Sequence, residues 1–247
     1  MNEILYKIFS LPAILLAITV HEYAHGYVSY KLGDPTAKSL GRLSLNPLHH
    51  LDPIGALLML LVGFGWAKPV PVNARYFKNP RKGMALVSVA GPASNILLAI
   101  LSALIYLLSI LGFNAMLGAL NVSEFMFKCM QYWLLFWQIN HVMNLSFALF
   151  NLIPLPPLDG SKILSLFIPK KHFIWLLQHE RQLSLFFMIW LLLGSRLSNF
   201  LLSYPSIARS PILSFIVKCF SLTGWLGDAV SFLSDLIYKL LELIPFL

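Results

Sequence analysis

Long, nearly uninterrupted runs of apolar residues restrict the folds that this sequence can adopt. The four longest cover about residues 4–30, 84–113, 125–152 and 183–202, and a helix needs about 20 such residues to cross the hydrocarbon core of a bilayer. Hydrophobic residues make up 58% of the 247 and charged residues only 11%, whereas a soluble domain carries about 25% charged residues. The sequence therefore predicts an α-helical polytopic membrane protein with about four to six transmembrane helices.

Residues 54–78, between the first two runs, show two further patterns. The apolar run Ile54–Trp66 has about 13 residues, which is too short to cross a bilayer and predicts a re-entrant or interfacial segment. Apolar side chains then alternate with others from Lys68 to Phe77, as in a half-exposed β-strand. We therefore expect a short re-entrant and β-hairpin segment between the first two spans.

The patterns divide the chain into two parts. Residues 1–182 hold the first three long runs and the motifs described below, so we expect them to form one membrane-embedded core. Residues 183–247 contain the fourth run, a stretch beyond Pro211 whose topology the sequence leaves open, and an amphipathic segment at Asp228–Ile244 that predicts an interfacial helix. Neither an internal repeat nor an appended soluble domain is expected.

Basic residues give the chain a net charge of +8. They flank the apolar runs and form no stripe with aromatic residues, so nucleic acid is not an expected partner. They concentrate at Lys31–Lys82 and Lys162–Arg181, after the first and third runs, while the connection after the second run has none before Lys128. Because cytoplasmic loops are enriched in Lys and Arg, this pattern orients both basic connections toward the cytoplasm. No cleavable signal and no disulfide framework are expected.

One motif in the first run has the spacing of a metal site. His21-Glu22-Tyr23-Ala24-His25 is an HExxH pattern, and histidines four positions apart lie one above the other on a helix, so both imidazoles reach one ion. Glu22 is rotated about 100° from His21, which lets it contact a catalytic water without being a ligand. The alternative is a pair of core histidines, but burying these polar residues in a lipid-spanning helix favours a functional site.

Asp159 is the best candidate for a third metal ligand, because catalytic zinc usually takes three protein ligands and one water. It follows the third run, where the proline-rich stretch IPLPP prevents a regular helix. Irregular backbone at membrane depth is tolerated only inside protein or beside a wet cavity. The alternative makes Asp159 the N-cap of the following helix. We expect one Zn²⁺ per chain, held by His21, His25 and Asp159.

Three asparagines, Asn140, Asn144 and Asn151, lie within about 40° of one another on one face of the third run. Such a polar stripe is expected to face the bundle interior or a water-filled cavity. Asn151 lies nearest Asp159, so we expect it to act in catalysis by donating its amide to a developing oxyanion; the alternative is a role in packing alone. Hydrogen bonding between helices is the better explanation of the other two.

These motifs together resemble the site-2 protease family of intramembrane zinc metalloproteases. The resemblance rests on two motifs, HEYAH and NLIPLPPLDG. Four segments that lie between these motifs are similar to segments of the compact bacterial members: GRLSLNP, HLDPIG, AKPVPVN and GPASN. The similarity extends over about residues 14–162. The resemblance implies that His21, His25 and Asp159 bind zinc, that Glu22 is the catalytic base, and that Asn151 matches the family's asparagine. The resemblance to bacterial members also implies a bacterial cytoplasmic membrane. The charge pattern puts the active site nearer its cytoplasmic face, because the first run approaches that side at Lys31 and the third run near Lys162. The regulatory PDZ and CBS domains of many relatives are not expected, so substrate selection falls to the core.

The implied activity is hydrolysis of peptide bonds in or near transmembrane segments of membrane proteins, with a transmembrane protein substrate and the lipid bilayer as partners. The oligomeric state is left open. A substrate helix must first unwind, and our hypothesis is that it then pairs with the edge of the strand expected at Lys68–Phe77. Two alternatives remain: a metal transporter that uses the same His/Asp cluster but has no need of Glu22, and a non-catalytic scaffold that binds membrane helices.

Overall fold

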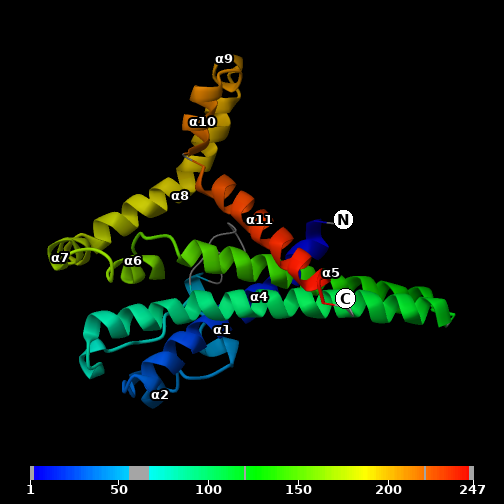
Figure 1. Ribbon diagram of the computed structural model, residues 1–247, viewed down its shortest axis with the longest axis horizontal. Coiled ribbons are helices and arrows are strands. Elements are labelled where there is room, and N and C mark those ends of the chain that lie inside the picture. Colours follow the sequence, from blue (N-terminus) through cyan, green and yellow to red (C-terminus); the bar gives the residue numbers. More distant parts are fainter. Residues whose placement is uncertain (1–2, 56–66, 120, 220, 245–247) are drawn as a thin grey trace.

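The computed structural model describes residues 3–55, 67–119, 121–219 and 221–244 (Figure 1). Within these ranges the regular elements are helices, and no sheet forms. In chain order, with η for a 3-10 helix, they are α1 (Glu3–Lys31), α2 (Thr36–Ser39), η1 (Pro47–His49), η2 (Ala74–Tyr76), α4 (Pro80–Ala119), α5 (Glu124–Asn151), α6 (Asp159–Leu164), α7 (Lys170–Gln178), α8 (Glu180–Leu202), α9 (Pro205–Ala208), α10 (Pro211–Cys219) and α11 (Leu222–Glu242).

Three long helices, α1, α4 and α5, pack together and form the centre of the molecule (Figure 1). The longest, α4, has 40 residues. Three of the described helices are long and apolar enough to cross a membrane, over Ile8–Lys31, Pro80–Gly118 and Glu180–Leu202. The prediction of a helical membrane protein is thereby confirmed. The 28-residue α5 is not among these three, because its Gln, Asn and His side chains lower its mean hydropathy.

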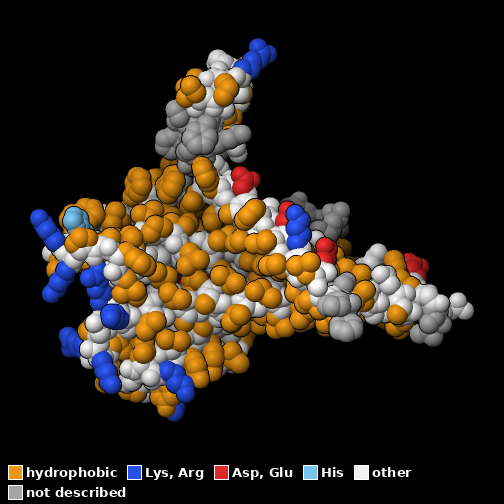
Figure 2. All heavy atoms as spheres, viewed as in Figure 1, with side chains coloured by type: hydrophobic (Ala, Val, Ile, Leu, Met, Phe, Trp, Pro, Cys, Tyr) orange, Lys and Arg blue, Asp and Glu red, His pale blue; other side chains and the backbone are white. Residues whose placement is uncertain are grey.

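Small side chains occupy much of the interior. Ala13, Ala17, Ala99, Ala103 and Ala148 are each at most 2% exposed. Small residues let helix backbones approach closely, which matters in a membrane because lipid solvates large apolar side chains as well as protein does. Many large apolar side chains instead cover the outside of the molecule (Figure 2), as expected for a surface in contact with lipid.

The last helix, α11, packs against α5, so the tail and the core are in contact. Val230 of α11 belongs to one buried cluster with Ala99 and Leu145. His141 joins the same three helices: its Nδ1–H donates to the carbonyl oxygen of Ala99 at 2.9 Å, and its Nε2 accepts from the hydroxyl of Ser234 at 2.9 Å. The predicted amphipathic segment thus lies almost entirely within α11, and one face of this helix is covered by protein.

The connection between α1 and α4 differs from its prediction. Its described part contains an isolated antiparallel bridge between Leu51 and Ala67. The β-hairpin is therefore not confirmed. Pro69 and Pro71 give a physical reason, since neither has the N–H group that a sheet ladder requires. The predicted re-entrant run at 54–66 lies almost entirely outside the described residues.

Candidate metal centre

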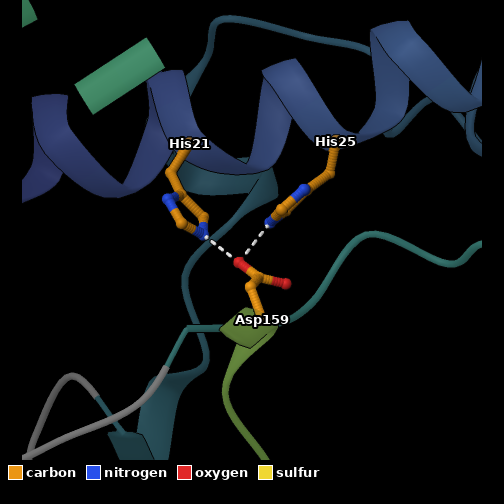
Figure 3. Close-up of side chains that lie close together, drawn as sticks. All are labelled: His21, His25 and Asp159. Atoms are coloured by element: carbon orange, nitrogen blue, oxygen red, sulfur yellow. Dashed lines mark hydrogen bonds and ion pairs between the residues drawn. The ribbon is translucent and has the colours of Figure 1, made fainter. Parts of the chain in front are cut away.

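His21 and His25 face the same side of α1, one helical turn apart (Figure 3). Their Nε2 atoms lie 3.1 and 3.0 Å from a single carboxylate oxygen, Oδ2 of Asp159. All three residues are buried, and their ligand atoms lie within 4.8 Å of one another. The fold thus brings together the three predicted zinc ligands, although 138 positions separate His21 from Asp159.

Asp159 reaches the histidines because the chain turns back between α5 and α6 (Figure 1). Gly160 lies so close to the end of α5 that a Cβ atom there would be 2.3 Å from the carbonyl oxygens of Leu152 and Ile153. The alternative role of Asp159 as an N-cap is wrong: Leu158 occupies the N-cap of α6, and no side chain caps the helix there. The Asp159 carboxylate faces the histidines instead.

Hydrogen bonds determine which ring nitrogens carry protons. His25 Nδ1 lies 2.7 Å from the carbonyl oxygen of Val87, which can only accept, so Nδ1 carries the proton. His21 Nδ1 lies 2.6 Å from Asn95 Oδ1. The orientation of the Asn95 amide follows from its nitrogen, which lies 3.0 Å from the carbonyl oxygen of Ala17 and must donate to it. His21 Nδ1 therefore also carries the proton.

In their neutral form, both imidazoles thus direct an Nε2 lone pair at the Asp159 carboxylate, so three electron-pair donors converge. A cation between them relieves the repulsion. Tetrahedral zinc, with bonds of about 2.0–2.2 Å, would hold such atoms about 3.3–3.5 Å apart, close to the observed 3.0 and 3.1 Å. Two imidazoles and one carboxylate, with a fourth position left for water, also match the ligand chemistry of catalytic zinc. The residues fit the metal.

Gly91 of α4 gives the two imidazoles the space that they occupy. A Cβ atom at Gly91 would lie 2.5 Å from Cε1 of His25 and 2.6 Å from Cε1 of His21. Real side chains do not approach this closely, so any other residue would displace the rings. The bare backbone of α4 is therefore one wall of the site.

A cleft of about 290 Å³ opens beside the three predicted ligands and is also lined by Glu22, Val70 and Asn151. Val70 belongs to the connection at residues 67–73, here named the strap. Its N–H donates to Oε2 of Glu22 at 2.7 Å, which holds the carboxylate at the cleft. The Asn151 amide donates to the carbonyl oxygen of Phe147 at 2.9 Å. Both residues predicted to be catalytic therefore lie beside the ligands.

The family model described as Peptidase family M50 matches residues 9–195 of the chain. This chain belongs to peptidase family M50. The resemblance to site-2 proteases is thereby confirmed, and the match extends beyond the residues that carried it. The chain is 44% identical over 174 residues to YwhC of Bacillus subtilis, which carries the name of a zinc metalloprotease; the match covers 68% of this chain and 75% of YwhC.

Two mycobacterial relatives of this M50 peptidase, both called Rip2, also carry the name of zinc metalloproteases. The protein from Mycolicibacterium smegmatis is 30% identical over 92 residues, which cover 35% of each chain. The protein from Mycobacterium tuberculosis is 28% identical over 152 residues, which cover 59% of this chain and 52% of the relative. No solved structure is significantly similar to the chain.

A series of buried polar side chains supports His21 in this M50 peptidase. Asn95 donates to Oδ1 of Asn144 at 2.8 Å, and Asn144 donates to Oδ1 of Asn140 at 2.7 Å. The Ser102 hydroxyl lies 3.0 Å from the same Asn140 oxygen. The prediction that Asn140 and Asn144 form hydrogen bonds between helices is confirmed. The role of Asn95 was not predicted, although a polar residue one turn after Gly91 in an apolar run was a signal for it.

Asp34 is a second residue whose role the sequence analysis missed. It is fully buried and accepts hydrogen bonds from the Ser29 hydroxyl at 2.8 Å, from the N–H of Asn73 at 2.7 Å, and from the N–H and hydroxyl of Thr36. Burial alone would raise the pKa of the Asp34 carboxyl, but these hydrogen bonds outweigh it and hold the pKa below its ordinary value of 3.8. Asp34 thereby ties the end of the strap to the end of α1.

Proposed function

We propose that this membrane-embedded M50 peptidase uses His21, His25 and Asp159 to hold one zinc ion and Glu22 as the general base. Its reaction is hydrolysis of peptide bonds in or near the transmembrane segments of other membrane proteins. The convergence of two imidazole lone pairs on one buried carboxylate oxygen carries this proposal. Zinc bound there supplies Lewis acidity, which polarises a carbonyl group and makes water nucleophilic near neutral pH.

Glu22 is placed to move the proton of the attacking water. Its Oε2 is held by the Val70 N–H, which fixes the carboxylate at the cleft and leaves Oε1 to accept the proton. Glu22 then passes that proton to the departing amine, as a general base that becomes a general acid. Because Glu22 follows His21 directly on α1, it faces the cleft without occupying a ligand position.

Asn151 is proposed to stabilise the negative charge that develops on the scissile carbonyl oxygen. A side-chain amide has two N–H donors, and the hydrogen bond to the Phe147 carbonyl uses one of them. The second is available to an oxyanion in the cleft that Asn151 lines. Preorganised donors of this kind are worth a factor of about 10²–10³ in rate.

The strap is proposed to hold the unwound substrate beside the metal. Val70 and Val72 both line the cleft. Among the described residues, the backbone N–H of Val72 makes no hydrogen bond, whereas those of Val70 and Asn73 are engaged by Glu22 and Asp34. An extended peptide whose carbonyl oxygen accepts a hydrogen bond from the Val72 N–H would lie along the cleft, as peptides do when they pair with the backbone of a binding protein.

The proposed topology has four crossings, made by α1, α4, α5 and α8, with residues 1–182 as the catalytic core and residues 183–247 as a helical tail. Lys and Arg side chains gather at the end of the molecule that carries α2, the start of α4, α6 and α7 (Figure 2). Asp159 begins α6, at that same end. By the preference of basic residues for the cytoplasmic side, we place the active site nearer the cytoplasmic face of a bacterial cytoplasmic membrane.

A comparison of membrane-protein fragments between cells with the wild type and cells with Glu22→Gln tests this function. The expected result is a set of fragments cut within or beside transmembrane segments that are present with the wild type and absent with the variant. Identical fragments in both would contradict the proposed role of Glu22. Zinc flux without any difference in fragments would favour a transporter.

A further inference from the structure

A second cavity, of about 530 Å³, adjoins the metal cleft. Val72, Met84 and Lys162 line both, so the two spaces meet at these side chains. The second cavity extends from the strap and the start of α4 toward α6 and α7. Its volume is within the range of about 300–1,000 Å³ that is found for ligand pockets. The cavity is therefore large enough for a side chain and not only for water.

Arg81 fixes one wall of this cavity. Its guanidinium donates to the backbone carbonyl oxygens of Ser165 and Ile168 and lies 5.7 Å from the ring centre of Phe173. These contacts join the start of α4 to α7 and to the connection between α6 and α7. Because the wall is held by a planar, always charged side chain with several donors, the cavity is formed before any substrate arrives.

The lining is mostly apolar, with charged groups at a few points. Ala74, Met84, Phe173 and Ile174 contribute apolar surface. Lys162, Lys170 and Glu180 line the same space, and Lys170 and Glu180 are exposed. An apolar pocket with few polar groups selects bulky apolar ligands, and the polar groups orient them.

We propose that this cavity is a specificity subsite that takes a bulky apolar side chain of the unwound substrate, close to the scissile bond. The inference rests on the proposed function. A peptide that hydrogen-bonds to Val72 and presents its scissile carbonyl group beside Asp159 would pass Met84 and Lys162. Both of these residues line the cleft and the second cavity, so a side chain of the peptide can enter the cavity there. The substrate class is therefore a transmembrane segment with a large apolar residue, such as Leu or Phe, beside its cleavage position.

The test uses a membrane reporter whose cleavage position has been mapped with the wild type, with Leu, Phe or Ala placed in turn at each flanking position. At one position the wild type is expected to cleave the Leu or Phe reporter at least about tenfold faster than the Ala reporter, as an apolar pocket discriminates. Ala74→Phe, which adds a phenyl group to the cavity lining and narrows the space, should reduce that preference to less than about threefold. Ala208→Phe, the same change at an exposed site on α9, should keep it.

The outcomes separate the subsite from the function. A wild type that cleaves reporters without any size preference, or an Ala74→Phe variant that keeps the preference shown by Ala208→Phe, would overturn the subsite alone. A wild type that cleaves no more than Glu22→Gln would overturn the proposed function and the subsite with it. Zinc content of the Ala74→Phe variant, expected to equal that of the wild type, verifies that the metal centre is intact.

A second measurement is independent of turnover. A photocrosslinking amino acid in place of Phe173, in the Glu22→Gln background, is expected to form an adduct with the reporter at the flanking position that the wild type selects. The same group in place of Ile189, which is 55% exposed on α8, is the control and should not form it. Adducts with lipid alone at Phe173 would mean that the cavity holds an acyl chain, and would overturn the proposal.

Discussion

His21 and Asn95 are joined by a buried hydrogen bond of 2.6 Å between Nδ1 and Oδ1. The same asparagine donates to the backbone of α1 at Ala17 and to Asn144 of α5. One side chain therefore links the three central helices and sets the tautomer of a proposed metal ligand. Partners of this kind orient the ligand and raise its basicity.

Asn95→Ala is expected to weaken zinc binding by about 10–100-fold, since His21 loses the acceptor that keeps the proton on Nδ1. Competition with a chelator on the purified protein measures this affinity. Ser102→Ala removes a hydroxyl at the far end of the same polar series and should have a much smaller effect. Equal affinities for Asn95→Ala and the wild type would contradict the supporting role.

Gly91→Ala is expected to abolish stoichiometric zinc binding and cleavage, because the added Cβ would lie 2.5–2.6 Å from both imidazoles. Gly112→Ala is the matched control: it lies on the same helix, and a Cβ there meets nothing within 4 Å. This control should bind zinc as the wild type does and gain slightly in stability, since alanine is favoured over glycine in a helix by about 1 kcal/mol. Metal analysis of the two purified variants decides, and full zinc occupancy in Gly91→Ala would refute the close approach of α4.

Val72→Pro is expected to slow cleavage while zinc content stays at the wild-type level, because proline removes the Val72 N–H, which makes no hydrogen bond to the described residues. Val72→Ala keeps the N–H and should lose less activity. Turnover of a reporter at saturating and limiting concentrations separates binding from chemistry. Unchanged turnover in the proline variant would count against pairing with the strap.

Asp34→Asn is expected to lower stability at about pH 7 by about 1–3 kcal/mol, because it disturbs hydrogen bonds to a buried carboxylate. The pKa of folded Asp34 is lowered below 3.8, so its contribution is present above that value and is lost as the pH falls through the folded-state pKa. The difference from the wild type should therefore narrow on acidification. Thermal unfolding at stepped pH measures it, with the exposed Asp228→Asn as control; a difference that is constant with pH would contradict the assignment.

The long helices were predictable because a membrane imposes a minimum length on apolar runs. The predicted runs at 4–30 and 125–152 coincide closely with α1 and α5, whereas α4 extends beyond both ends of 84–113. The strand predicted at Lys68–Phe77 was not confirmed. The prediction followed the alternation of apolar side chains and gave too little weight to Pro69 and Pro71, which lack the N–H group that a sheet requires. Of the alternating apolar side chains, Val70 and Val72 line the cleft, whereas Tyr76 is exposed.

The convergence of His21, His25 and Asp159 could be predicted from the sequence. Helical spacing brings His21 to His25, and the proline-rich break after the third run makes Asp159 available as a third group. The partners of Asn95 and Asp34 could not be predicted, because they lie 74 and 39 positions away along the chain. The polar Asn95 in an apolar run signalled that it has a role, but not which residue it contacts. The alternative N-cap role of Asp159 was wrong for a similar reason: the turn that Gly160 permits directs the carboxylate to α1 rather than to its own helix.

The most direct test of the metal centre and its base measures zinc content and reporter cleavage on the same purified samples. The wild type should hold about one zinc per chain and cleave, as expected for a site with three protein ligands. Glu22→Gln should hold the same amount and not cleave, while Asp159→Ala should lose both zinc and cleavage. Full zinc occupancy in Asp159→Ala, or cleavage by Glu22→Gln, would contradict this account.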